Sequence, residues 1–159
     1  MMKRALLTQL SEQLRREIEL AQRVALASHE AATHEEARPE NDKDTRSVEA
    51  AYLAGAQAGR VRDLERLVNA LAFLELRAFS PGDPIAPTAL IEVELDGKRA
   101  HYFLSPIGGG LRAEVEGCSI QLVTPETPVG QALLGKTTGD VVEVRAAGRL
   151  REYEIIGIS

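Results

Sequence analysis

The chain is poor in cysteine, in long apolar runs and in positive charge, and each scarcity excludes a class of protein. Its one cysteine, Cys118, has no partner in the sequence for an internal disulfide. No apolar run approaches the roughly 20 residues that a membrane-spanning helix requires. Charged residues from Lys3 to Arg16 interrupt the segment in which a secretory signal would carry its apolar core. We therefore expect a cytoplasmic protein with no membrane partner.

Positive charge is outweighed by negative charge over the 159 residues. The chain has 19 lysines and arginines against 24 aspartates and glutamates, a net charge of −5 and a pI near 5.3. Proteins that coat nucleic acids neutralise many phosphates with basic side chains, so this balance argues against that class. The sequence also contains no nucleophile motif, phosphate-binding loop or zinc-ligand spacing. We expect that the chain is not an enzyme by itself.

Residues 1–77 carry an apolar pattern of helical period in two arms. Apolar and small residues recur every three or four positions with charged residues between them, which is the spacing of one face of a helix. The first arm is marked by Leu7, Leu10, Leu14, Ile18, Ala21, Ala25, Ser28 and Ala32. The second arm is marked by Val48, Tyr52, Gly55, Ala58, Val61, Leu64, Val68, Leu71 and Leu74. The pattern predicts two long helices.

A short acidic stretch at residues 35–44 separates the two arms. Pro39 lacks a backbone donor and disfavours helical dihedral angles at the residue before it, so the first helix should end nearby. Asp44 or Thr45 is the expected N-cap of the second helix, because its side-chain oxygen can accept a free amide hydrogen. A reversal near residue 40 pairs large apolar residues at the base and small ones toward the turn. These features predict an antiparallel coiled-coil hairpin about 50 Å long with a slender outer half.

The sequence changes character after the second arm. Residues 78–87 contain three prolines and a glycine, which is typical of a linker. Beyond it, apolar residues alternate over short segments, and Asp-Gly at 96–97 is the strongest two-residue signal for a β-hairpin. A short helix is expected within 125–134 and a second hairpin around 147–148. Residues 88–159 should form a small antiparallel sheet packed on one short helix, so the fold class is α+β.

The C-terminal motifs resemble those of the Gre family of bacterial transcript-cleavage elongation factors. Residues 127–136 read Thr-Pro-Val-Gly-Gln-Ala-Leu-Leu-Gly-Lys, and residues 139–144 read Gly-Asp-Val-Val-Glu-Val. In that family a Ser-Pro string that ends in Gly-Lys precedes a Gly-Asp-x-Val strand. The resemblance extends to the order of the parts, which is a coiled-coil hairpin, a linker and a globular domain similar to the FKBP fold.

The resemblance implies a partner and a metal. Gre factors bind RNA polymerase and thread the hairpin into its secondary channel, where acidic residues of the turn help hold a second Mg²⁺; the nascent RNA and the DNA are contacted indirectly. Mg²⁺ prefers hard oxygen ligands and often keeps several waters, so carboxylates from outside can complete such a site. The resemblance implies that Asp44 and Asp42 face this shared ion, with Glu40 next. The Asp-x-x-Glu spacing of the family turn is absent here.

Two further surfaces are candidates for partner contact. Glu126, Thr127 and Pro128 match the short turn with which Gre globular domains contact the polymerase rim, although the same residues can also start a helix. Basic residues of the two arms lie level with one another and form a candidate basic patch. They are Arg15, Arg16, Arg23, Arg60, Arg62 and Arg66. A solvated helical face balanced by neighbouring acids is the alternative interpretation of this patch.

These observations lead us to expect a monomeric elongation factor that stimulates cleavage of backtracked transcripts by the polymerase. The second hypothesis is a Gre-related protein that enters the same channel and inhibits or modulates the enzyme. A third is a coiled-coil interaction protein or a relative of the nucleoside diphosphate kinase regulator, whose hairpin is shorter. Prolyl isomerase activity is not expected, because Tyr102, Phe103 and Tyr153 are the only aromatic residues of the globular part.

Overall fold

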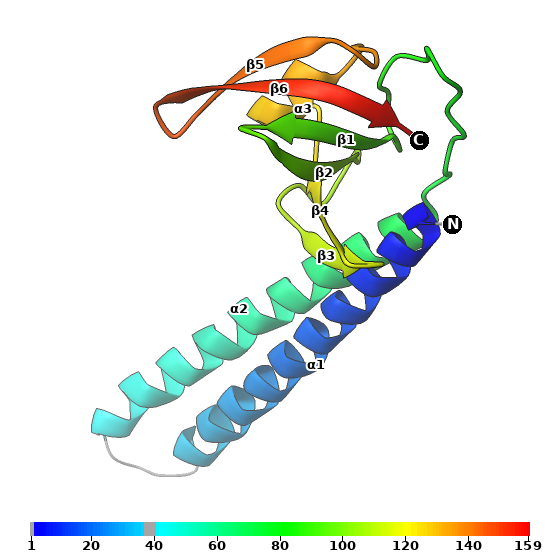
Figure 1. The fold of residues 1–159 in the computed structure, drawn as a ribbon. Helices are drawn as coiled ribbons and strands as arrows, with labels where there is room; N and C mark the ends of the chain where they lie inside the picture. Colours follow the sequence, from blue (N-terminus) through cyan, green and yellow to red (C-terminus); the bar gives the residue numbers. More distant parts are fainter. Residues whose placement is uncertain (1, 37–40) are drawn as a thin grey trace. The chain divides into compact units, whose positions relative to one another are not determined.

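The computed structural model describes residues 2–36 and 41–159 (Figure 1). The chain divides into two compact units. The helical unit is Ser11–Ala70, and the globular unit joins Met1–Leu10 to Leu71–Ser159. These units are defined by packing, and the globular unit combines two separate stretches of the chain. The domain boundaries expected after residues 77 and 87 therefore stay predictions.

Two long helices, α1 (Met2–Glu36) and α2 (Asn41–Ala72), contain all the described residues of the helical unit. Leu14 of α1 and Val68 of α2 are almost completely buried, as expected of a seam between the arms. Arg60 and Glu17 form an ion pair of 3.2 Å between the helices, at positions that a reversal near residue 40 places opposite each other. The predicted antiparallel hairpin is confirmed. Within the described residues, no helix combines the length and apolar character that crossing a bilayer demands.

The prediction that Asp44 or Thr45 is the N-cap of α2 was wrong. The helix already begins at Asn41, so Asp44 and Thr45 lie inside it. Acidic residues are favourable within a first helical turn as well as at the cap, because both positions place negative charge near the positive end of the helix dipole. Sequence signals of this kind fix a helix start only to within a few residues.

Small residues do line the outer part of the hairpin, but large apolar residues accompany them. Ala21 is buried and Ala25 is partly buried, in agreement with the predicted small-residue seam. In contrast, exposed fractions of large apolar side chains in this part range from 41% to 76%. These side chains are Leu20, Val24, Leu26, Val48, Tyr52 and Leu53. A narrow seam between two helices covers only the residues that point directly into it, so the neighbouring positions stay in solvent.

The globular unit is built on one six-stranded sheet. Its strands are β1 (Leu90–Leu95), β2 (Lys98–Leu104), β3 (Arg112–Val115), β4 (Cys118–Val123), β5 (Val141–Ala146) and β6 (Arg149–Ile158). Their order across the sheet is β3-β4-β2-β1-β6-β5. One short helix, α3 (Pro128–Leu133), follows β4. The predicted α+β class, with a sheet and a single short helix after the helical hairpin, is confirmed.

The sheet is mixed rather than antiparallel, which corrects one part of the prediction. β4 pairs with β2 in parallel, from His101 opposite Ile120 to Leu104 opposite Val123. The reason is the edge strand β3, which was not expected. After β2 the chain passes to the outside of the sheet, forms β3, and turns back to place β4 between β3 and β2.

The two predicted hairpin turns are confirmed. Asp96 and Gly97 have φ values of 52° and 74°, and Ala147 and Gly148 have 52° and 74°. Two successive residues with positive φ match the right-handed twist of the strands that they join. The unexpected β3–β4 hairpin uses the same geometry at residues 116–117.

The main core of the globular unit lies between α3 and one face of the sheet. Val93, Leu104 and Ile155 are at most 1% exposed and pack in one cluster with Leu133 of α3. Alternate residues of each strand point to one face, so the short amphipathic helix covers the apolar face and leaves its own outer side in water.

The first turns of α1 belong to the globular unit and hold the segment between α2 and β1. Residues 73–89 contain no helix or strand. Lys3 Nζ donates to the carbonyl oxygens of Arg77 (2.6 Å) and Thr88 (3.1 Å), and it lies 4.9 Å from the centre of the Phe79 ring. Leu6 is fully buried. We call Lys3 and its three contacts in residues 77–88 the base clasp.

Candidate functional site

The turn before α3 is organised by Thr127. Its hydroxyl donates to the carbonyl oxygen of Thr124 (2.8 Å) and accepts from the backbone N–H of Gly130 (3.2 Å). Thr127 has extended dihedral angles and is the N-cap of α3, while Pro128 occupies the first helical position. Pro suits that position because its missing N–H would have no partner inside the helix. The helix-start interpretation of this motif is therefore confirmed.

Gly130 allows the backbone of α3 to approach the carbonyl group of Thr124 closely. A Cβ atom added at this position would overlap the carbonyl oxygen of Thr124 and lie 2.9 Å from Thr127 Oγ1. No side chain fits between them, so any substitution must displace the backbone of the turn. Sequence reasoning did not single out Gly130, because a glycine inside a helical pattern shows only a cost to the helix and not what lies against it.

The three residues expected to contact the polymerase rim differ in their exposure to solvent. Glu126 and Pro128 are exposed, whereas Thr127 is partly buried and engaged in the cap. Leu134, just after α3, is 42% exposed. The turn thus presents an acidic and an apolar side chain on a backbone that Thr127 and Gly130 hold in place. Its contact with a partner stays a prediction.

Residues at the end of the first motif and at the start of the second have structural roles next to the turn. Gly135 N–H donates to the carbonyl oxygen of Ile85 (2.8 Å), and Ile85 N–H donates to that of Lys136 (2.8 Å). Asp140 Oδ2 accepts from the backbone N–H of Thr137 (2.9 Å) and from its hydroxyl (3.2 Å). The backbone hydrogen bond from Thr137, more than its hydroxyl and Lys136, lowers the pKa of Asp140. These residues therefore fix the connection between α3 and β5.

The basic patch of the helical unit is exposed and only partly neutralised. Arg60 pairs with Glu17, Arg66 lies 3.6 Å from Asp63, and Arg23 lies 3.8 Å from Glu19. For Arg15, Arg16 and Arg62, the described part of the chain provides no ion pair within 4.0 Å. Exposed pairs contribute little to stability and exchange readily with other anions. The patch is compatible with both interpretations given for it.

The acidic turn falls largely outside what the structure describes. Glu40 lies outside the described residues, and for Asp42 and Asp44 only the backbone is described, within the first turns of α2. Positions two apart on a helix do not face each other. Among the residues that are described, no group of three or more histidine, cysteine, aspartate or glutamate side chains could hold a metal ion. The assignment of these residues as Mg²⁺ ligands stays a prediction. Their carboxylate oxygens are donors of the kind that Mg²⁺ prefers.

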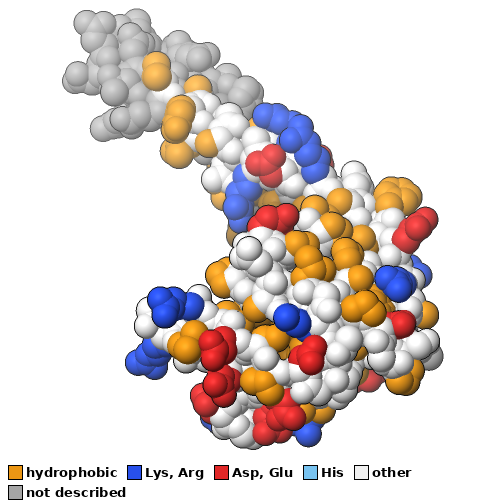
Figure 2. Space-filling view, turned by 90° about the horizontal axis from the view of Figure 1, so that it is seen from above, with side chains coloured by type: hydrophobic (Ala, Val, Ile, Leu, Met, Phe, Trp, Pro, Cys, Tyr) orange, Lys and Arg blue, Asp and Glu red, His pale blue; other side chains and the backbone are white. Residues whose placement is uncertain are grey.

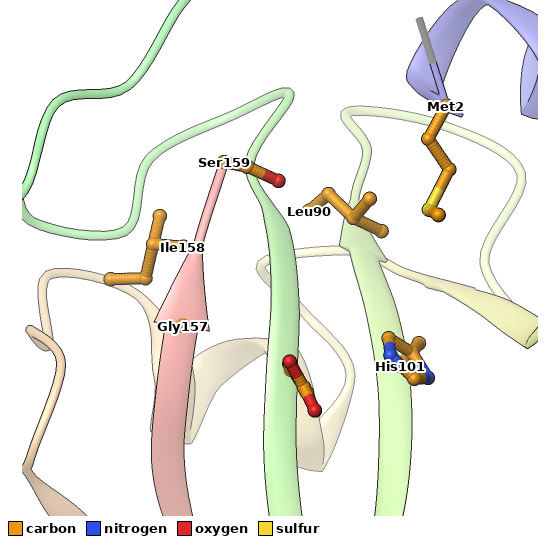
Figure 3. Close-up of a pocket in the computed structure, with 7 residues that line it drawn as sticks. Met2, Leu90, His101, Gly157, Ile158 and Ser159 are labelled. Atoms are coloured by element: carbon orange, nitrogen blue, oxygen red, sulfur yellow. The ribbon is translucent and has the colours of Figure 1, made fainter.

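A hollow of about 280 Å³ lies at the start of β1 and the end of β6, beside the middle of β2 (Figure 3). Leu90, His101 and Ile158 line it together with Met2. Glu92 also lines the hollow, but its carboxylate accepts from Arg99 at 2.7 Å. The lining offers no acid and base free to act together, so we assign it no chemistry.

Comparison with known proteins agrees with this picture. Residues 113–159 match the family described as transcription elongation factor, GreA/GreB, C-terminal part. The chain is 31% identical to transcription elongation factor GreA of Mesorhizobium japonicum over 153 residues, which cover 94% of this chain and 90% of that protein. It is 32% identical to GreA of Brucella anthropi over 120 residues, or 70% of this chain and 71% of that protein.

Solved structures of the same group are also similar. GreA factor homolog 1 (Gfh1) of Thermus thermophilus aligns over 94% of both chains with 18% identity and a TM-score of 0.39. A GreA/GreB factor of Nitrosomonas europaea aligns over 60% of this chain and 78% of that one, with 20% identity and a TM-score of 0.38. From the identity to GreA along nearly its whole length, the chain belongs to the GreA/GreB family of transcription elongation factors.

Proposed function

We propose that this chain binds RNA polymerase, inserts its helical hairpin into the secondary channel and stimulates Mg²⁺-dependent cleavage of backtracked transcripts. The observation that carries the proposal is membership of the GreA/GreB family over 94% of the chain, which includes both helices and the globular unit. An antiparallel pair of helices, each more than 30 residues long, is narrow enough to enter a channel.

The carboxylates of the turn are the groups that this proposal delivers. Asp44 and Asp42 have the metal-facing role in this proposal, with Glu40 next, although positions 42 and 44 do not share one side of α2. Each carboxylate would lend oxygen ligands to an Mg²⁺ ion that the polymerase also holds. The ion supplies stabilisation of charge on the attacking and leaving oxygens. The chain itself supplies ligands and position, so it is not a catalyst without the polymerase.

The two other surfaces position the hairpin in this proposal. Glu126 and Pro128 project from the fixed turn and dock on the rim of the channel. Arg15, Arg16 and Arg62 have no ion pair with the described residues and are available for contact with the polymerase.

The first test uses a stalled, backtracked elongation complex with Mg²⁺. The wild-type protein should release short 3′ RNA fragments, and Asp44→Asn should reduce their rate of release by about 100-fold, since loss of a metal ligand or its support commonly costs this much. Asp63→Asn is the matched control, because Asp63 is an exposed acid elsewhere on α2. Equal release by wild type and Asp44→Asn would refute the role of Asp44. The protein without polymerase should release nothing.

A second candidate function is inhibition or modulation of the polymerase without cleavage. The observation that favours it is the absence of Asp-x-x-Glu from residues 35–44. The same assay separates the two, because an inhibitor slows elongation and leaves the backtracked RNA intact. The match to GreA covers the hairpin as well as the globular unit. It therefore favours both candidates over an unrelated interaction protein or a relative of the nucleoside diphosphate kinase regulator.

A further inference from the structure

One part of the sheet in the globular unit gathers hydrogen-bond donors around a small hollow. The hollow has a volume of about 210 Å³. Side chains or backbone of Arg99, Tyr102, Arg112, Ser119 and Gln121 line it. None of the lining residues is acidic, although the chain as a whole carries a net charge of −5. We call this site the donor hollow.

The strand register explains why these side chains meet. Tyr102 of β2 is the partner of Gln121 of β4, and Gln121 is in turn the partner of Arg112 of β3. Directly paired residues of neighbouring strands point to the same face of a sheet. Arg112 Nη2 donates to Gln121 Oε1 at 2.7 Å. Because the amide oxygen is occupied in this way, the amide nitrogen of Gln121 is left to donate elsewhere.

One of the two arginines of the donor hollow lacks an ion-pair partner among the described residues. Arg99 is neutralised by Glu92 (2.7 Å) and Glu94 (3.7 Å). Arg112 has a neutral amide as its partner, and in the described ranges it forms no ion pair within 4.0 Å. The site therefore holds one guanidinium, Arg112, that no described carboxylate contacts within 4.0 Å.

Tyr102 contributes a donor that keeps its proton. Its ring makes an edge-to-face contact with Tyr153, with centres 6.1 Å apart. Burial, aided by the hydrogen bond and charge of Tyr153, raises the pKa of Tyr102 to about 12, against the opposite effect of Arg112 and Arg151. At neutral pH Tyr102 is therefore an uncharged hydroxyl in the same hollow as Arg112.

We propose that the donor hollow binds the phosphate group of a phosphate monoester. Arg112 offers a planar fork that suits phosphate oxygens, and Tyr102, Ser119 and Gln121 offer neutral donors around it. A carboxylate has two oxygens in one plane, whereas phosphate presents four oxygens in three dimensions to donors from three strands. The volume is below that of usual sites for drug-sized ligands, so it suits a phosphate with the rest of the molecule outside.

The test is a titration of the full chain with inorganic phosphate at constant ionic strength, with chloride as the reference salt. Backbone amide signals of Ser119 and Gln121 should shift and saturate in the wild-type NMR spectrum. Arg112→Gln should weaken binding about tenfold or more, since one charge-assisted hydrogen bond is lost. Arg145→Gln removes the same charge from β5, outside the hollow, and should bind as the wild type does.

Other variants and ligands complete the test. Arg112→Lys should restore part of the affinity, and Gln121→Leu should reduce it if the donor hollow is the site. Adenosine 5′-monophosphate against adenosine, and 5′-phosphorylated against 5′-hydroxyl RNA, identify whether the phosphate comes from a nucleotide or from an RNA end. Preference for the phosphorylated member of a pair supports the proposal. Shifts that do not saturate, or equal weakening by Arg145→Gln, would overturn it without bearing on transcript cleavage.

Discussion

The two units of this chain bury their apolar residues to different extents. In the globular unit, residues such as Leu122, Val93 and Ile155 are at most 1% exposed. In the outer part of the helical unit, Leu26 and Tyr52 are 59% and 76% exposed. Figure 2 shows apolar side chains at the surface of this hairpin. A two-layer unit encloses a core, whereas two helices alone can bury only one stripe each. Stability should therefore be concentrated in the globular unit.

Replacing one leucine in each unit by alanine should give the largest difference in stability. Leu122→Ala should lower the free energy of unfolding by about 3 kcal/mol, because it empties part of a close-packed core. Leu26→Ala should change it by less than about 0.5 kcal/mol, because the side chain is mostly in water already. Chemical denaturation followed by circular dichroism would measure both. Similar losses for the two variants would contradict the contrast.

Replacing one glycine in each unit by alanine should change stability in opposite directions. Gly130→Ala should cost about 2 kcal/mol, since its Cβ has no space against Thr124 and Thr127. Gly55→Ala in α2 meets nothing within 4 Å, and it should stabilise that helix by up to about 1 kcal/mol. Thermal unfolding should show a lower midpoint for the first variant only. Polymerase binding by Gly130→Ala should fall as well, because Glu126 and Pro128 depend on this turn.

The smallest expected effect is a loss of stability of the globular unit at high pH. Because burial raises the folded-state pKa of Tyr102 from 10 to about 12, the stability given by the neutral phenol is complete below pH 10. It is lost as the pH rises through 12. After allowance for its partial exposure, the change is about 1 kcal/mol. Denaturation at pH 9 and 12 should show this loss in the wild type. The same loss in Tyr102→Phe would refute the assignment to Tyr102.

Local signals predicted the parts of the fold that depend on local geometry. Asp96-Gly97 and Ala147-Gly148 specify their turns through dihedral preference, and Thr127-Pro128 specifies the start of α3. The helical period predicted both arms and their antiparallel seam. These features need only neighbouring residues, so one sequence is enough to predict them.

Features that depend on distant parts of the chain were missed. Nothing near β3 indicates that β4 inserts between it and β2, because that placement follows from pairing across the sheet. Tyr102, Arg112 and Gln121 lie on three separate strands and meet only through the register of those strands. The contact of Lys3 with Thr88 joins residues 85 positions apart. Of the candidate site, the Thr127 cap was predictable, whereas the role of Gly130 required coordinates.

The base clasp has a consequence for exchanging parts between related proteins. Because residues before Ser11 and after Ala70 both belong to the globular unit, the hairpin is an insertion into that unit. A cut within residues 78–87 would remove Lys3 and Leu6 from the body that they help to close. Residues 11–70 are therefore the natural cassette for grafting a foreign hairpin, and the first ten residues should travel with the sheet.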